Sequence, residues 1–189
     1  VACVITEPVL TNSCMVLPEP GFLEGVRKLT RKAGTLLLID ETHTISTGPG
    51  GYTRKHGLDP DLFVLGKPVA GGVPASVWGM SEEVAARYAA YNGTKEPGYS
   101  GMGTTLSANP LQFAAMRAAL EEVMTEANYA RMEKLAERLA TGLDKAIRKR
   151  KLPWHVMRVG ARVEFICAPG PLRNGGEAEH AHASRLEAA

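Results

Sequence analysis

The stretch from Thr35 to Gly72 constrains the fold most, because it holds two short apolar runs that each precede a charged residue. The runs Thr35–Ile39 and Leu62–Leu65 are continuous and bounded by turn residues, which is typical of strands buried on both faces. Asp40 follows the first run directly, and Lys67 follows the second. Open α/β sheets bind ligands at the carboxyl ends of their strands. The sequence therefore predicts a site with one acid and one amine at this edge.

An acid and an amine placed in this way fit the chemistry of pyridoxal phosphate. A lysine amine condenses with the aldehyde of this cofactor to form a Schiff base. A carboxylate beside the ring nitrogen keeps that nitrogen protonated, with an attraction of about 4 kcal/mol at ~4 Å and an effective dielectric constant of ~20. We also expect Lys67 to be buried between the strand end and the Gly/Pro turn, which would lower the pKa of its amine.

A second strand and a helix are predicted upstream of this stretch. The short apolar run Ala2–Thr6 is followed by Glu7 and a proline, which marks the end of a strand. A helix is expected over residues 21–32, because its apolar side chains share one face and its basic residues gather at its end. Strand, helix and strand in this order indicate a parallel pair. Glu7 should then lie at the same sheet edge as Asp40.

The residues after Asp40 include Gly48-Pro49-Gly50-Gly51, which we predict to be a flexible loop. It is not a nucleotide-binding P-loop, because no Lys-Ser or Lys-Thr follows it. Ala75–Met80 is a third apolar run, and Ser81 is the expected cap of a helix that starts at Glu82.

The second half of the chain is predicted to be mainly helical and then β. Asn92–Asn109 is rich in Gly, Ser and Thr, which suits close contact with an anion. Helices are expected over Pro110–Met124 and Glu126–Lys149, and alternating residues predict antiparallel strands over His155–Val159 and Arg162–Ile166. Four apolar side chains of the longer helix recur at helical spacing and should pack against the protein: Met132, Leu135, Leu139 and Leu143.

Composition narrows the class of protein. A hydrophobic content of 44% supports a real core, and a net charge of +2 gives no general attraction to nucleic acid or to a membrane. No apolar run is long enough to span a bilayer, and the first residues lack the pattern of a signal peptide. The three cysteines are few and unpatterned, so we expect a reduced, cytoplasmic protein without a disulfide framework or a metal site.

Four motifs occur in order, each at the expected end of a strand or helix: Glu7-Pro8, Leu38-Ile39-Asp40-Glu41, Leu65-Gly66-Lys67 with Gly71-Gly72-Val73-Pro74, and Thr105-Leu106-Ser107-Ala108-Asn109-Pro110. The set resembles class III aminotransferases, which are pyridoxal-phosphate enzymes of fold type I. The longer strings TNSCMVLPEPGF, DETHTISTGPGGYTRKHGLDPDLFVLGKPVAGGVP and GYSGMGTTLSANP are most similar to β-amino-acid (β-phenylalanine) aminotransferases. Glutamate-1-semialdehyde 2,1-aminomutases are the next most similar branch.

The resemblance implies roles for five residues. Lys67 would carry the cofactor and move the substrate proton, and Asp40 would pair with the ring nitrogen. Thr105 would bind the cofactor phosphate across a dimer interface, and Glu7 would belong to the network around the ring. Thr42 stands where the family more often has valine against the ring face, a departure that concerns the stacking contact but not the chemistry.

The resemblance also implies an architecture and partners. Residues 1–124 would be the C-terminal half of the large cofactor-binding α/β domain, with a mainly parallel sheet and flanking helices. Residues 125–189 would be the linking helix and the first part of a small α+β domain, so we expect an internal portion of a longer enzyme. That enzyme would be a homodimer that moves an amino group from an amino acid to a 2-oxo acid.

Three alternatives are open. LLLIDETH also has the strand-then-DExH form of a nucleotide-dependent helicase, although that leaves Lys67 and its glycine turn without a role. A non-catalytic relative of the aminotransferases is a second alternative. Within the enzyme hypothesis, His43 either joins Asp40 as an acid/base pair or only lines the site.

Overall fold

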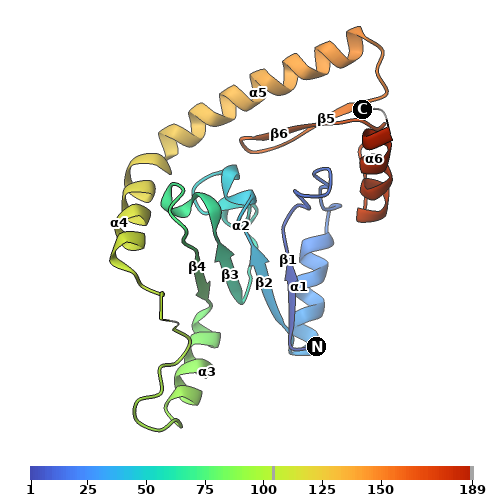
Figure 1. The fold of residues 1–189 in the computed structure, drawn as a ribbon. Helices are drawn as coiled ribbons and strands as arrows, with labels where there is room; N and C mark the ends of the chain where they lie inside the picture. The colour runs from blue at the N-terminus through green and yellow to red at the C-terminus, as the bar shows by residue number, and fades with distance from the viewer. Residues whose placement is uncertain (104, 188–189) are drawn as a thin grey trace.

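The computed structural model describes residues 1–103 and 105–187, and these form one four-stranded sheet, one β-hairpin and the helices around them (Figure 1). The strands of the larger sheet stand side by side, with α1 (Phe22–Ala33) packed along β1 and β2. The longest helix, α5 (Glu126–Lys149), crosses above the sheet and lies over the hairpin. No helix in the described part of the chain has the length and apolar composition that crossing a bilayer requires.

The predicted βαβ unit and its parallel pair are confirmed. Strands β1 (Cys3–Thr6), β2 (Leu36–Asp40) and β3 (Leu62–Leu65) are parallel neighbours, and β4 (Val77–Met80) pairs with β3 in the antiparallel direction. Because parallel strands end at the same edge, the residues that follow β1, β2 and β3 meet there. This mixed α/β fold with a mostly parallel sheet is the predicted class.

The prediction of a flexible loop at residues 48–51 was wrong in part. A 3₁₀ turn over Thr44–Thr47 leads into the short helix α2 (Gly51–His56). The cause is Glu41, which is fully buried and accepts hydrogen bonds from the Thr44 hydroxyl and from the Tyr52 and Thr53 backbone N–H groups. A buried carboxylate must be fully hydrogen-bonded, so it orders the first turn of the helix.

The helical half follows the predicted order with one irregularity. Helix α3 (Glu82–Asn92) begins at Ser81, whose hydroxyl accepts from the Val84 N–H. Helix α4 (Pro110–Ala118) is capped by Asn109 and continues as a π-helical turn over Ala119–Val123. The hairpin strands β5 (His155–Val159) and β6 (Arg162–Ile166) have the predicted bounds, and α6 (Gly175–Glu187) completes the described chain.

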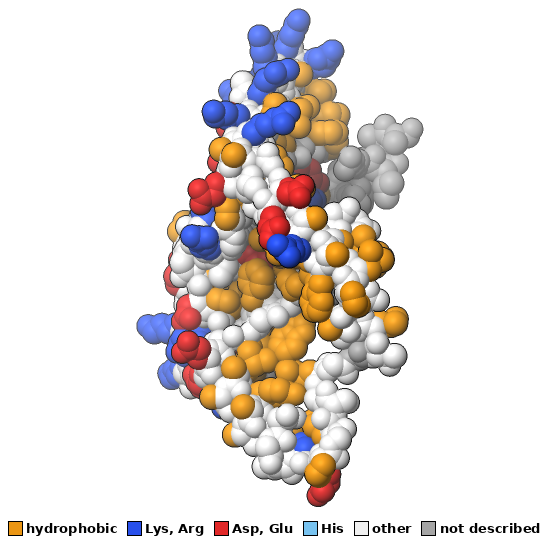
Figure 2. All heavy atoms as spheres, turned by 90° about the vertical axis from the view of Figure 1, so that its left-hand side faces the viewer, with side chains coloured by type: hydrophobic (Ala, Val, Ile, Leu, Met, Phe, Trp, Pro, Cys, Tyr) orange, Lys and Arg blue, Asp and Glu red, His pale blue; other side chains and the backbone are white. Residues whose placement is uncertain are grey.

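The apolar stripe of α5 does not pack as expected. Leu135 and Leu139 are 52% and 54% exposed, and Figure 2 shows orange side chains gathered over a large part of one face of the molecule. Tyr129, Ala136 and Ile147 are the buried residues of this helix instead. The prediction fails for Met132, Leu135 and Leu139, whereas Leu143 is half-buried and lines a pocket with Phe165 of the hairpin.

The hairpin packs against the loops that follow β1 and β2. The Ala161 N–H donates to the Ser46 carbonyl at 3.1 Å, and Val159 packs against the buried side chains of Val9 and Met15. Gly160 has a φ of +55°, and a Cβ there would lie 2.4 Å from the Thr47 Cα. Glycine is thus needed for this close approach. The division of the chain at residue 124 into two domains stays a prediction.

A nearly buried ion pair joins α1 to the sheet. The Arg27 guanidinium donates to both carboxylate oxygens of Asp61 at 2.6 and 2.9 Å, and Asp61 also accepts from the Leu37 N–H at 2.8 Å. The Asp61 side chain is 12% exposed. We expect Asp61→Asn to lower the free energy of unfolding of the full-length protein by about 3 kcal/mol in urea denaturation, because Arg27 would lose its bidentate partner and keep only the exposed Asp59, 3.6 Å away.

The pH dependence follows from the same pair. The hydrogen bond from Arg27 holds the pKa of Asp61 below its ordinary value of 3.8. A lowered carboxyl pKa stabilises the fold above the unfolded-state pKa, and this contribution is lost as the pH falls through the folded-state pKa. The stability gap between wild type and Asp61→Asn should thus be constant near neutral pH and shrink below about pH 4. Asp59→Asn is the matched control, because Asp59 is 65% exposed and should cost under about 1 kcal/mol. Equal losses for the two variants would contradict the assignment.

Candidate active site

Asp40 and Thr42 form a turn at the carboxyl end of β2. The Asp40 carboxylate is half-buried, and its Oδ1 accepts from the Thr42 N–H at 2.8 Å. The Thr42 hydroxyl accepts from the Gly66 N–H at 3.2 Å, directly before Lys67. Thr42 therefore ties the turn that holds Asp40 to the turn that holds Lys67. A valine at position 42 could not make this bond, because it has no hydroxyl.

Lys67 stands on the neighbouring turn but is not buried. It begins a 3₁₀ segment, Lys67–Ala70, with a φ of +45°, a conformation that non-glycine residues rarely adopt. The expectation of a buried Lys67 was wrong, because the side chain is exposed while Val69 and Ala70 are buried. The fold thus holds the backbone beside Lys67 and leaves the amine accessible.

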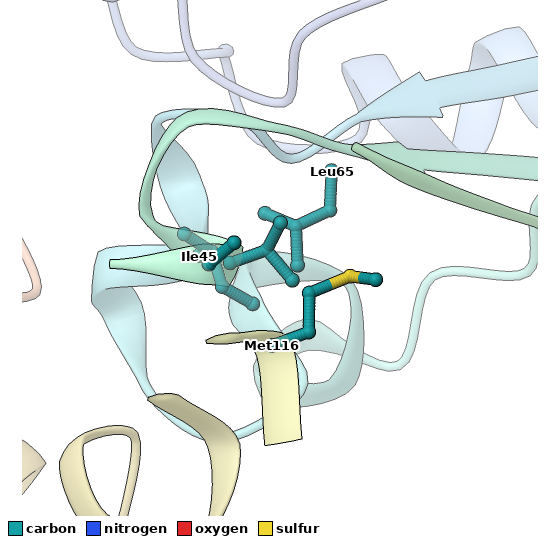
Figure 3. Close-up of a cluster of buried hydrophobic side chains, with 5 residues drawn as sticks. Ile45, Leu65 and Met116 are labelled. Carbon is teal, nitrogen blue, oxygen red and sulfur yellow. The ribbon is translucent and has the colours of Figure 1, made fainter. Parts of the chain in front are cut away.

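The turn that carries Lys67 rests on a compact hydrophobic cluster. Figure 3 shows Ile45, Leu65 and Met116 converging from three separate parts of the chain. Val69 and Ala70 complete the buried set, so the residues on both sides of Lys67 belong to it. The Gln112 side chain also donates to the Pro74 carbonyl at 2.9 Å, which joins α4 to the loop after this turn. Packing on both sides fixes the backbone of the turn from which the exposed Lys67 side chain extends.

Glu7 lies at the same edge and is joined to His43 through Thr11. The Thr11 hydroxyl donates to Glu7 Oε2 at 2.7 Å and contacts His43 Nδ1 in a very short hydrogen bond. His43 Nδ1 is 3.9 Å from Glu7 Oε2. Sequence reasoning did not single out Thr11, because a buried threonine in a loop carries no signal of its own. The contact depends on residues 32 positions apart.

The charges of four neighbouring residues act on the His43 side chain. Burial lowers the pKa of His43 most, the positive charges of Lys67 and Arg162 lower it further, and Glu7 and Asp40 oppose the shift. The charges of three predicted cofactor contacts, Lys67, Asp40 and Glu7, therefore act on this one ring. Arg162, which sequence reasoning also missed, comes from β6 and donates to the Thr11 carbonyl at 3.1 Å.

Thr105 is exposed in a turn before α4. The ribbon between α3 and α4 lies on the outer side of β4, the edge strand farthest from β1 (Figure 1). The next residues, Leu106–Ala108, line an open groove of about 640 Å³ together with β4 and α4. Hydrogen bonds at the sheet edge involve Glu7, Asp40, Thr42 and the residue before Lys67, and Thr105 takes part in none of these bonds.

The residues at the sheet edge fit pyridoxal phosphate chemically. Lys67 offers an accessible primary amine on a turn with a fixed position. Among the described residues, the only hydrogen bond that we find to the Asp40 carboxylate goes to Oδ1. Oδ2 thus suits a positively charged ring N–H. An amine, a carboxylate and hydroxyl groups are the functional groups that hold this cofactor.

Comparison with known proteins identifies relatives over the whole chain. Residues 1–168 match the family model described as aminotransferase class-III. The glutamate-1-semialdehyde 2,1-aminomutase 2 of Brevibacillus brevis is 37% identical over 188 residues, which are 99% of this chain and 42% of that protein. This chain therefore spans about two fifths of the length of the curated relatives that it matches.

Solved structures show the same fold. A glutamate-1-semialdehyde aminomutase from Pseudomonas aeruginosa PAO1 is 51% identical with a TM-score of 0.90, over 95% of this chain and 40% of that chain. A second structure of that enzyme is a complex with PMP. A β-phenylalanine aminotransferase from Variovorax paradoxus is 25% identical with a TM-score of 0.80, over 93% of this chain and 40% of that chain.

Proposed function

This chain belongs to the class-III aminotransferase family of pyridoxal-phosphate enzymes, and from that premise we propose that the full-length protein is an aminomutase that acts on glutamate 1-semialdehyde. The proposal is carried by curated relatives at 36–37% identity that have that name, in a chain that places Asp40 and Lys67 on two turns joined through Thr42. The relatives thus favour this activity over the β-amino-acid transamination that the motif strings suggested.

The residues of the chain have distinct proposed roles. When bound, pyridoxal phosphate supplies an aldehyde that reacts with amines and a ring that accepts electrons from the substrate carbon. Lys67 holds the cofactor and moves the substrate proton, and Asp40 keeps the ring nitrogen protonated. Thr42 holds the two turns in register through its bond to the Gly66 N–H. Glu7 acts at a distance, through Thr11 and His43.

Thr105 has a role only in an assembly. Its exposed position in the turn before α4 suits a phosphate contact in the site of a second copy of the protein. We therefore propose a homodimer with shared active sites. The helicase alternative has no support left, since the family match includes the whole Asp40 stretch.

Transamination of a β-amino acid with a 2-oxo acid is the second candidate. The fold similarity to the Variovorax enzyme, with a TM-score of 0.80, favours it. The two activities differ in their need for an acceptor. An aminomutase substrate carries both the amino group and the carbonyl group, whereas a transaminase consumes a separate oxo acid.

The substrate test uses this difference. We expect the full-length protein to convert glutamate 1-semialdehyde into 5-amino-4-oxopentanoate without an added oxo acid, measured by chromatography of the product. Its kcat/KM should exceed that for β-phenylalanine with 2-oxoglutarate at least about tenfold, a difference of about 1.4 kcal/mol in transition-state stabilisation. Faster turnover of β-phenylalanine would make the second candidate correct. Cofactor binding without turnover of either substrate would favour the non-catalytic alternative.

A further inference from the structure

The hydrogen-bond chain from Glu7 through Thr11 to His43 determines which nitrogen of the imidazole carries the proton. A carboxylate can only accept, so the Thr11 hydroxyl donates its single hydrogen to Glu7 Oε2. The same oxygen must then accept from His43, which makes Nδ1 the protonated nitrogen. Nε2 is left with its lone pair, as a hydrogen-bond acceptor.

The surroundings hold this arrangement in place. Thr11 is 1% exposed, and the His43 side chain is 13% exposed. The Arg162 guanidinium, on β6, donates a hydrogen bond to the Thr11 carbonyl and holds Thr11 in position. Burial, with the charges of Lys67 and Arg162, lowers the pKa of His43 below its ordinary value of 6.5, so the ring is neutral at pH 7. The result is a neutral base with a defined lone pair, directly after Thr42, whose hydroxyl binds the N–H of the residue before Lys67.

The Lys67 ammonium must lose a proton before its amine can react with an aldehyde. We propose that His43 accepts the proton that the Lys67 ammonium loses before it reacts, with Glu7 and Thr11 as positioning residues. The proton moves from Lys67 Nζ to His43 Nε2, directly or through one water, and the lone pair stays on Nζ. The positive charge moves to the imidazole, where the carboxylates of Glu7 and Asp40 favour it and offset part of the effect of burial.

The first test concerns the tautomer and does not depend on activity. In the full-length protein with ¹⁵N-labelled histidine, His43 should resonate at pH 7 as a neutral ring protonated at Nδ1, with the signal assigned by its loss in His43→Gln. Thr11→Val should shift the signal toward the Nε2–H tautomer, because the valine cannot accept from Nδ1. An Nε2–H tautomer in the wild-type protein would overturn the proposal.

The second test measures the rate at which apoenzyme captures pyridoxal phosphate as a function of pH. His43→Gln should slow capture about 100-fold at pH 7. The rate should fall as the pH drops through the His43 pKa, so Glu7→Gln should move this fall to lower pH and Arg162→Met to higher pH.

His56→Gln is the control, because His56 is exposed and stacks on Tyr52 outside this group. It should leave the profile unchanged. Identical pH profiles for Glu7→Gln and Arg162→Met would contradict the proposal, even where both variants capture the cofactor slowly. The proposal rests on the proposed function only in treating Lys67 as the reacting amine. Failure of wild-type apoenzyme to capture any cofactor would therefore refute the function, whereas normal capture by His43→Gln would refute only the role of His43.

Discussion

Lys67→Ala should abolish turnover, with a loss of at least about a thousandfold, because the variant lacks both the amine that holds the cofactor and the group that moves the proton. The turn itself should survive, since Val69 and Ala70 supply its buried contacts and the lysine side chain is exposed. The measurement is borohydride reduction of the full-length holoenzyme, followed by peptide mass mapping. Wild type should carry the reduced cofactor on Lys67, and the variant should carry none.

Lys55→Ala is the matched control for this experiment. Lys55 is half-exposed on α2 and forms an ion pair with Glu133 on α5 at 3.0 Å. It has no proposed role in the chemistry at the sheet edge. Its loss should change turnover less than about twofold, because exposed ion pairs contribute about 1 kcal/mol or less to stability. A reduced cofactor found on any lysine other than Lys67 would end the assignment of the site.

Asp40→Asn should reduce kcat about a thousandfold. A carboxylate ~4 Å from the ring nitrogen stabilises its proton by about 4 kcal/mol, and an asparagine supplies no charge. The amide still has a carbonyl oxygen that can accept from the Thr42 N–H, so the turn should keep its shape. We therefore expect the dissociation constant of the cofactor to rise much less than kcat falls, with both measured on the full-length protein.

Asp144→Asn is the control for Asp40→Asn, because it also removes one carboxylate. Asp144 pairs with Arg148 along the exposed face of α5 and should be almost neutral in both measurements. Turnover of Asp40→Asn within about tenfold of wild type would rule out the proposed ring contact, because the electrostatic argument requires a larger effect. Loss of cofactor binding alone would assign Asp40 to anchoring rather than to catalysis.

The predicted elements that agree with the structure depend on local patterns. The continuous apolar runs before Asp40 and Lys67 became parallel neighbours, because short Leu- and Ile-rich segments between turns have few other ways to be buried. Helix α5 and both hairpin strands have the predicted bounds, since caps and alternation are readable within a few residues.

The errors concern contacts between distant segments. The run of glycines at 48–51 looked flexible, yet Glu41 orders the helix that follows it. The stripe at Leu135 and Leu139 looked like packing, yet the described chain leaves it exposed. Helical spacing identifies an apolar face but not the partner of that face.

Local chemistry alone was enough to place an acid after one strand and an amine after the next, because strand ends and turns are encoded within a few neighbouring residues. Tertiary packing decided the exposure of Lys67, the tether from Thr42 to Gly66 and the contact of Thr11 with His43. Each of these depends on how segments 24 or more residues apart meet at the sheet edge. Hydrogen bonds and burial at such meetings are properties of the fold and not of any short stretch of chain.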